Sequence, residues 1–485
     1  MPMKIQKMQI QTLLCYTSIL SVAFSLYLVS VFDLDAILII MIVILGSSPL
    51  FFAAIRKNSD ALSPEVVLPF TYMLFALGPM SLSSKFSSDV ITYYLFLQLM
   101  GLLAMCLGLH IAARQRKRVE FNHSFDTQEP RTRFLLLATA IGMLLLSCIS
   151  LATYFNAFGG LAGYINVGYG GQYYLIAENA SIIGPGFEWL LLGSILLIYY
   201  GIKYNSKSCL LIGIVLISFA TVIILITGRR RQILYPFLFG IMLFHYSCKK
   251  IPSPVIAGGL LFGISIAQYY ALARYYLPKG LIYALSQVWP VVLKNPVLIA
   301  PWSGSSNQFV MPAASLLEVL QYGGPGFLWG SSYIASLAAP FPFVIRLFSE
   351  VSFDVSKWRM ETLYPNQLAA GIGFTFSPVT EGYVNFGLLG IILHLFLYGY
   401  IIGTIYARLS SKSTLSNLLL FAGSAPVFLL DGMCVASSSA AYTWTRIYLM
   451  PWIIYWGLKI VLPRSYKQHS ADEDSKMKEL EGKPT

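Results

Sequence analysis

Charged residues are scarce in this chain of 485 residues. They make up only 11% of the sequence, whereas 56% of the residues are hydrophobic and the mean hydropathy is +0.68. A soluble globular domain carries about a quarter charged residues, so this composition excludes that class of protein. The sequence is typical of a protein that lies within a lipid bilayer.

The patterns of resident cofactors are also missing. The six cysteines have neither metal-ligand spacing nor the arrangement of a disulfide framework, so we expect them to be packing residues. The chain contains no P-loop and no dinucleotide-binding glycine motif. We therefore predict no metal site and no cofactor, and any activity must lie in or beside the membrane.

Long apolar runs are what the sequence does contain. A helix that crosses the hydrocarbon core needs about 20 apolar residues. About twelve runs approach or exceed this length, at 10–31, 36–55, 66–81, 90–113, 134–158, 187–204, 209–226, 233–246, 252–273, 383–407, 415–435 and 442–462. The sequence predicts an all-α integral membrane protein with about 12 transmembrane helices.

Lysine and arginine gather in alternate connections between these runs. With the N-terminus in the cytoplasm, about two thirds of the 33 basic residues fall on the cytoplasmic side, as the positive-inside rule requires. Both termini are then cytoplasmic, and the polar residues 463–485 form a disordered tail. This bias, beside anionic membrane lipids, accounts for most of the net charge of +12 without a nucleic-acid partner.

Two outer connections are long enough to be functional rather than simple links. One is the Gly/Tyr-rich segment 159–186, and the other spans 274–382. Semi-apolar stretches at 281–300 and 327–349 are broken by prolines, which favours interfacial or re-entrant helices; if both crossed the membrane, the chain would have fourteen spans. The predicted organisation is nine helices in 1–273, a large outer loop in 274–382, three helices in 383–462 and the tail 463–485.

Three adjacent arginines, Arg229, Arg230 and Arg231, lie on the outer side, against the positive-inside bias. Guanidinium groups bind phosphate oxygens bidentately and do not lose their charge, and an acidic ligand would relieve the repulsion among the three. Arg274, at the outer end of the next outward span, is a second candidate for the same pocket. The alternative for all four is contact with lipid headgroups at the membrane boundary.

A second group of candidate residues lies where the large loop enters the next span, in Ser377–Gly390. Glu381 and Asn385 are spaced one helical turn apart and share a face. A carboxylate beside a cationic loop serves either as a proton acceptor or as the counter-ion of an arginine, and an arginine neighbour would weaken it as a base. On an unbroken helix His394 would lie about 20 Å from Glu381, so we expect a packed or hydrogen-bonded histidine there, not a catalytic partner.

Glycines recur along the same predicted helix. They allow close approach of neighbouring helices and stand at Gly387, Gly390, Gly399 and Gly403.

These motifs resemble those of the Wzy-type O-antigen polymerases, which are multi-span proteins of the Gram-negative inner membrane with one large periplasmic loop. The resemblance is carried by Thr227–Arg231 at the end of a span, by Arg274 at the start of the large loop, and by Glu381–Gly390 at its end. It implies glycosyl transfer between two undecaprenyl-diphosphate-linked oligosaccharides on the periplasmic face, without a metal. It also implies a chain-length regulator as a partner and, by analogy, a GT-C-like fold.

The resemblance assigns roles to the candidate residues. Arg229, Arg230, Arg231 and Arg274 would stabilise the departing diphosphate, with Arg230 foremost in catalysis. Glu381 would accept the proton of the attacking sugar hydroxyl, and Tyr383 and Asn385 would bind substrate.

Three alternatives stay open. An O-antigen ligase is expected to use a periplasmic histidine, and by this topology no histidine lies in an outer loop. Another polyprenyl-phosphate-dependent glycosyltransferase would share the cationic residues. A lipid-linked oligosaccharide flippase or transporter would bind the same lipid, but the halves of the chain show no internal repeat, and the charge clusters lie at the outer boundary, not at mid-membrane.

Overall fold

The computed structural model describes residues 34–55, 60–115, 130–166, 185–226, 231–273, 276, 280–295, 310–338, 353–369 and 373–462. Within these residues every regular element is a helix, and seven helices are long and apolar enough to cross a membrane. The predicted class, an α-helical membrane protein, is confirmed at this level.

The seven long spans coincide with predicted apolar runs. They are α2 (Leu34–Ile55), α3 (Pro64–Leu77) with η1 (Gly78–Lys85), α4 (Ser88–Arg114), α5 (Pro130–Ala157), α8 (Gly186–Lys203), α9 (Lys207–Ile226) and α18 (Pro378–Ser411). Four further helices occupy predicted runs: α10 (Arg231–Ser247), α11 (Ser253–Ala273), α19 (Leu415–Leu429) and α21 (Met450–Val461). The run 10–31 lies outside the described residues.

The remaining helices are shorter. They are α6 (Gly160–Asn166), α12 (Leu281–Lys294), α13 (Met311–Tyr322), α14 (Ser331–Ala338), α16 (Val355–Leu363), α17 (Pro365–Ala369), η4 (Asp431–Met433), α20 (Ser437–Tyr442) and η5 (Thr443–Tyr448). The two semi-apolar stretches of the large loop contain α12, with 14 residues, and α14, with 8. Both helices are shorter than the about 20 residues that a perpendicular span needs.

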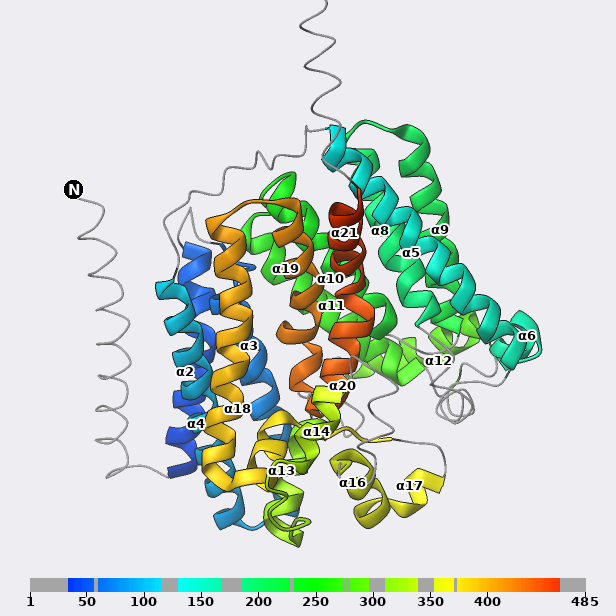
Figure 1. The fold of residues 1–485 in the computed structure, drawn as a ribbon. Helices are drawn as coiled ribbons and strands as arrows, with labels where there is room; N and C mark the ends of the chain where they lie inside the picture. Colours follow the sequence, from blue (N-terminus) through cyan, green and yellow to red (C-terminus); the bar gives the residue numbers. More distant parts are fainter. Residues whose placement is uncertain are drawn as a thin grey trace, which may run out of the picture.

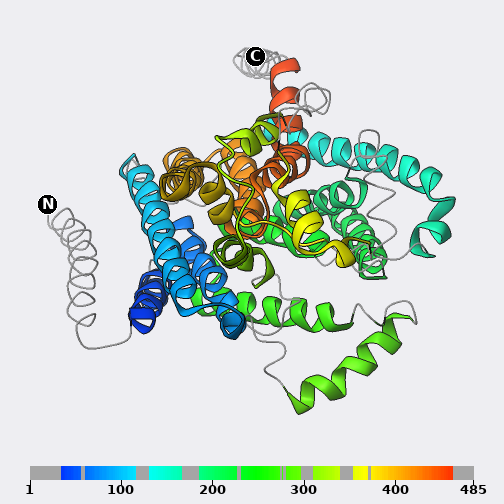
Figure 2. The same cartoon turned by 90° about the horizontal axis from the view of Figure 1, so that it is seen from below.

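The long helices stand side by side as a bundle with two distinct ends (Figure 1). Helices α13, α14, α16 and α17 gather at one end, which we call the loop end, while the links after α8, α10 and α18 lie at the other, the link end. Helices α11 and α12 lie along one side and form a small apolar cluster of their own (Figure 2). This alternation of links agrees with the order of inward and outward spans that the sequence predicts.

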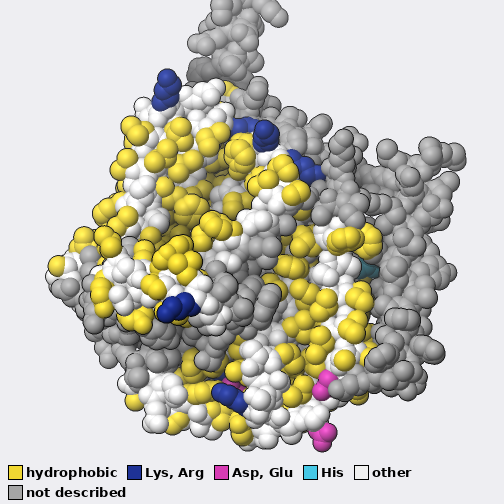
Figure 3. Space-filling model, turned by 180° about the vertical axis from the view of Figure 1, so that it is seen from behind, with side chains coloured by type: hydrophobic (Ala, Val, Ile, Leu, Met, Phe, Trp, Pro, Cys, Tyr) yellow, Lys and Arg dark blue, Asp and Glu magenta, His cyan; other side chains and the backbone are white. Residues whose placement is uncertain are grey.

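The flank of the bundle is apolar. Hydrophobic side chains cover the broad middle of the face in Figure 3, and the acidic side chains visible on it lie near its lower rim. Large apolar side chains such as Leu211 and Phe262 are 64% and 68% exposed. Such a surface is stable against lipid chains, which need no hydrogen bonds from it.

Helices α4 and α18 pack with almost no space between their backbones. A Cβ atom added to Gly399 would lie 2.3 Å from the carbonyl oxygen of Met105, and one added to Gly108 would lie 2.2 Å from that of Phe396. Gly403 is also confined, since its Cβ would lie 2.7 Å from the Cβ of Ala112. The predicted close approach at Gly399 and Gly403 is confirmed, and close packing of this kind drives helix association in lipid.

Helix α18 is not continuous. Phe386 and Gly387 have non-helical backbone angles, with φ 62° and ψ −144° at Gly387. A Cβ atom on Gly390 would lie 2.0 Å from the carbonyl oxygen of Gly382, although these residues would be about 12 Å apart along an unbroken helix. The chain therefore turns back at Gly387, and a short helical piece (378–385) lies against the start of the long span (388–411).

Candidate functional site

Glu381 is the centre of a buried polar cluster at the loop end. Ser377 caps the short helical piece of α18 by accepting a hydrogen bond from the Thr380 N–H, which sets Glu381 in the first turns. The Glu381 carboxylate is fully buried. Its Oε1 accepts from the hydroxyls of Ser332 and Ser437, both at 2.8 Å, and its Oε2 accepts from the Ser437 N–H at 2.7 Å.

Asn385 continues this cluster from the same face of the helix. Its side-chain amide donates to Ser332 Oγ at 2.8 Å and to the Glu381 carbonyl at 2.7 Å, and its Oδ1 accepts from the Gly330 N–H at 2.8 Å. The predicted one-turn spacing of Glu381 and Asn385 is therefore confirmed. The two residues join three segments, α18, α14 and α20, that are distant in the sequence.

Tyr333 and His394 lie at the edge of the cluster. The Tyr333 hydroxyl is 3.0 Å from His394 Nδ1 and also reaches the Asn385 side chain. Burial, reinforced by the negative charge of Glu381, raises the pKa of Tyr333 well above its ordinary value, so the phenol stays protonated. Both side chains are only partly buried, unlike Glu381.

His394 is hydrogen-bonded, as predicted, but its predicted distance from the segment around Glu381 is wrong. Its imidazole hydrogen bonds to the backbone of Pro378, which would be about 24 Å away on an unbroken helix. The reversal at Gly387 accounts for this, because it folds the short helical piece back along the long span. A histidine in a membrane helix thus reaches the loop end of the molecule.

The counter-ion role considered for Glu381 has no partner among the described residues, where its polar contacts are to serines. A different buried ion pair lies nearby, between Arg359 of α16 and Glu318 of α13, with Nε–Oε2 and Nη2–Oε1 distances both 2.8 Å. Tyr364 donates to Glu318 Oε1, and Arg359 also donates to the Thr375 carbonyl. This fork fixes α16 onto the bundle and was not anticipated from the sequence, because its partners are 41 residues apart.

Tyr383 points away from Glu381. It is partly buried, and its ring packs edge-on against Tyr93 of α4 at 6.5 Å between centroids. The two predicted substrate-binding residues of this segment thus face different surroundings, since Asn385 is fully buried in the polar cluster.

Of the four arginines predicted to bind the diphosphate, one lies within the described residues. Arg229, Arg230 and Arg274 lie outside them, whereas Arg231 begins α10. Next to it, Gln232 donates to Glu188 Oε1 of α8 at 2.6 Å, and on α8 the Trp189 indole donates to the Arg446 carbonyl at 3.1 Å. The start of α10 therefore lies beside η5.

Arg446 is a further cation of the site, which the sequence did not distinguish from the other basic residues. Its guanidinium lies 4.8 Å from the centroid of the Tyr442 ring, is partly exposed, and makes no ion pair with a carboxylate among the described residues. A cation–π contact leaves the guanidinium N–H groups available to an anion. The segment 443–448 is a π-helix, a geometry often found at functional sites.

The segment from α20 to η5 joins the two parts of the site. Ser437 contacts Glu381, and Arg446 of the same segment contacts α8 beside the start of α10. On a helix these two residues are about 14 Å apart. Figure 1 shows α20 between α14 and α21 at the loop end.

The chain matches no protein-family model, no curated protein and no solved structure.

No group of three metal-ligating side chains occurs within the part of the chain that the structure describes. The chemistry available there consists of a neutral phenol, an imidazole, a buried carboxylate and the Arg446 guanidinium. These groups suit proton transfer beside a stabilised anion.

Proposed function

We propose that this protein is an O-antigen polymerase that transfers the growing glycan from undecaprenyl diphosphate onto an incoming lipid-linked repeat unit, at the periplasmic face of the inner membrane. The observation that carries the proposal is the α20–η5 segment, which links the polar cluster around Glu381 to Arg446 beside the start of α10. Such a reaction needs cations for a departing diphosphate and polar groups for a sugar hydroxyl, at one membrane surface.

The bond changes assign work to the cations. The acceptor hydroxyl attacks the anomeric carbon of the growing chain, the bond from that carbon to the diphosphate oxygen breaks, and undecaprenyl diphosphate departs with the electron pair. Negative charge that develops on the leaving oxygen is stabilised by fixed guanidinium groups. We add Arg446 to Arg229, Arg230, Arg231 and Arg274 for this role.

The contacts around Glu381 favour a positioning role over proton acceptance. Both carboxylate oxygens already accept hydrogen bonds, and the side chain is fully buried. We assign proton acceptance instead to the partly buried pair of Tyr333 and His394. The hydroxyl proton of the acceptor passes to the Tyr333 oxygen while the Tyr333 proton passes to His394 Nδ1, 3.0 Å away.

One observation also favours a second candidate function. An O-antigen ligase is expected to use a histidine on the periplasmic side, and His394 reaches the loop end through Tyr333 and Pro378. Both enzymes would release undecaprenyl diphosphate, but the ligase transfers the finished glycan to the lipid core.

A surface-polysaccharide gel separates these functions. If the protein is the polymerase, a strain without the gene shows lipid core capped by a single repeat unit, and complementation restores the ladder of long chains. A bare core with unligated long glycan identifies the ligase instead. A bare core with no polymer at all points to failed export or synthesis and overturns both assignments.

The same gel tests the residues by complementation at matched protein levels. We expect Arg230→Ala and Arg446→Ala to lose long chains because each removes a cation that stabilises the leaving diphosphate. We expect Tyr333→Phe and His394→Asn to lose them because general acid–base groups contribute about 100-fold or more. Tyr322→Phe is the matched control, because that ring is 64% exposed on α13, and it should support normal ladders. Normal ladders in Tyr333→Phe and His394→Asn would refute the proton pathway. The polymerase assignment would be unaffected, because the deletion strain tests it separately.

A further inference from the structure

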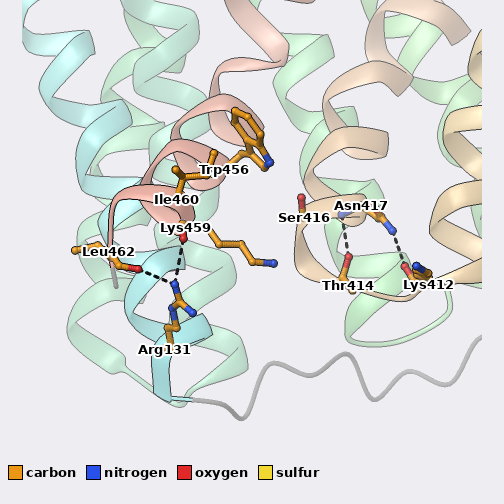
Figure 4. Close-up of a pocket in the computed structure, with 9 residues that line it drawn as sticks. All are labelled: Arg131, Lys412, Thr414, Ser416, Asn417, Trp456, Lys459, Ile460 and Leu462. Atoms are coloured by element: carbon orange, nitrogen blue, oxygen red, sulfur yellow. Dashed lines mark hydrogen bonds between the residues drawn. The ribbon is translucent and has the colours of Figure 1, made fainter. Parts of the chain in front are cut away.

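A pocket of about 560 Å³ lies at the link end, far from the polar cluster, between α5, α19 and α21 (Figure 4). Three cations line it, Arg131, Lys412 and Lys459, and no carboxylate does. The positive-inside rule accounts for cations at this end but not for their convergence on one cavity. Three like charges around a cavity repel one another, which an anionic ligand relieves.

Arg131 is fixed in position by the end of α21. Its Nη2 donates to the carbonyl oxygens of Lys459 at 3.1 Å and Leu462 at 2.7 Å, which belong to the last turn of that helix and the residue after it. Those carbonyls lack intrahelical partners, so the guanidinium completes the helix end. Its Nη1 makes no hydrogen bond within the described residues and remains available to a ligand.

Lys459 and Lys412 supply the mobile charges. Both side chains are exposed, and neither forms an ion pair within the described residues. The Lys459 side chain extends from α21 toward α19, across the space that Thr414 and Ser416 border (Figure 4). A phosphate between the helices would thus be met by the Nη1 group of a fixed guanidinium and by two adaptable ammonium groups.

The remaining wall of the pocket is apolar. Trp456 and Ile460 line it and are 51% and 61% exposed on the outer face of α21. Cations on one side and lipid-facing apolar groups on the other match a molecule with a phosphate and an acyl chain, and a free phosphate would use only the cations. We infer that this pocket binds the phosphate of an anionic phospholipid, with an acyl chain along Trp456 and Ile460.

Lipid retention by the purified full-length protein tests this inference. The protein is reconstituted in nanodiscs of phosphatidylcholine with a minor fraction of phosphatidylglycerol, extracted into detergent, and the retained lipids are counted by mass spectrometry. The pocket variant is Lys412→Gln with Lys459→Gln. Arg131 is left unchanged because it also caps the C-terminal end of α21.

The control variant is Lys207→Gln with Lys250→Gln, two exposed lysines at the same end that do not line the pocket. It removes the same charge from the same surface. We expect the pocket variant to lose retained phosphatidylglycerol by about tenfold or more, since each lysine near an anionic lipid contributes several-fold, while the control retains the native amount.

Three outcomes would overturn the inference. Equal losses in both variants would mean that diffuse charge holds the lipid, and no loss in either would mean that the pocket does not hold it. In the third, millimolar inorganic phosphate would lower the amount of phosphatidylglycerol retained by the native protein but not the amount retained by the pocket variant. That result would identify a free phosphate as the ligand.

Discussion

At the scale of single residues, the buried carboxylate of Glu381 joins three helices of the loop end, α18, α14 and α20. A carboxylate has about four acceptor positions, and three of them at Glu381 are filled by Ser332 and Ser437. Each hydrogen bond to a charged group contributes about 1.5–3 kcal/mol. The residue thus holds α14 and the start of α20 against α18, and a change there should be felt as loss of stability.

Glu381→Gln should lower the stability of the protein by about 1–3 kcal/mol. An amide replaces one acceptor oxygen with an NH₂ group. At the Oε2 position this group faces the Ser437 N–H, donor against donor, and at the Oε1 position both serine hydroxyls must rotate from donating to accepting. The measurement is the apparent melting temperature of the purified protein in detergent. Glu361→Gln is the control, because Glu361 is 53% exposed and its ion pair with Lys357 spans 3.7 Å at the surface, where such pairs contribute little. Equal melting temperatures for the two variants would contradict the structural role of Glu381.

The sequence predicted one half of this cluster and missed the other. Glu381 and Asn385 could be placed on one face because the helical period fixes the direction of residues four apart. Ser332 and Ser437 are 49 and 56 residues from Glu381, and serine is too common to mark a partner by itself. Tyr333 and Arg446 were missed for the same reason, since their roles arise from contacts between distant segments.

At the scale of elements, the turn within α18 decides which residues meet. Gly387, at φ 62° and ψ −144°, occupies a backbone region open almost only to glycine. The glycine pattern predicted close approach, which Gly399 and Gly403 confirm, but glycine serves tight packing and left-handed turns equally. Sequence alone therefore could not distinguish a smooth span from the reversal that brings His394 to the loop end.

Gly387→Ala should destabilise the protein by about 1–3 kcal/mol and, under the proposed polymerase function, shorten the glycan ladder. Space is not the obstacle, because the nearest atom to an added Cβ is a Phe327 ring carbon at 3.7 Å. The penalty comes from the backbone angle, and relaxing it would pull Glu381 and Asn385 away from their serine partners. The apparent melting temperature and the ladder measure the two effects.

Gly457→Ala is the matched control for this prediction. Gly457 lies within α21, no atom lies within 4 Å of its added Cβ, and alanine favours a helix by up to about 1 kcal/mol over glycine. We expect this variant to be neutral or slightly more stable. If Gly387→Ala behaves in the same way, the turn is not held by the glycine.

At the scale of the whole molecule, hydropathy and polar contacts have separate roles. Apolar runs predicted the helices well because every backbone group within a bilayer must be bonded inside its own helix. Hydropathy does not specify which helices are neighbours, since lipid chains solvate them all equally. Polar contacts at the two ends help to determine which helices are neighbours. They centre on Glu381 and Arg359 at the loop end and on Asp60 at the link end.

Asp60 joins three distant parts of the chain. It follows α2 and accepts hydrogen bonds from His245 at 3.2 Å and from Tyr246 at 2.7 Å, both on α10, and from Tyr406 on α18. Burial alone would raise the pKa of Asp60. The hydrogen bonds and the charge attraction from His245, with the two tyrosine hydroxyls, hold the pKa below its usual value instead.

Asp60→Asn should therefore destabilise the protein in a manner that depends on pH. The folded-state pKa of Asp60 lies below the unfolded value of about 3.9, so its stabilising contribution is present above that pH and is lost as the pH falls through the folded-state pKa. The gap in apparent melting temperature between native protein and Asp60→Asn should be constant from about pH 6 to 8 and narrow below about pH 4. Asp89→Asn, at an exposed carboxylate near the start of α4, should show no such gap. A gap that widens on acidification would mean that the neutral form of Asp60 holds α10 and α18 together.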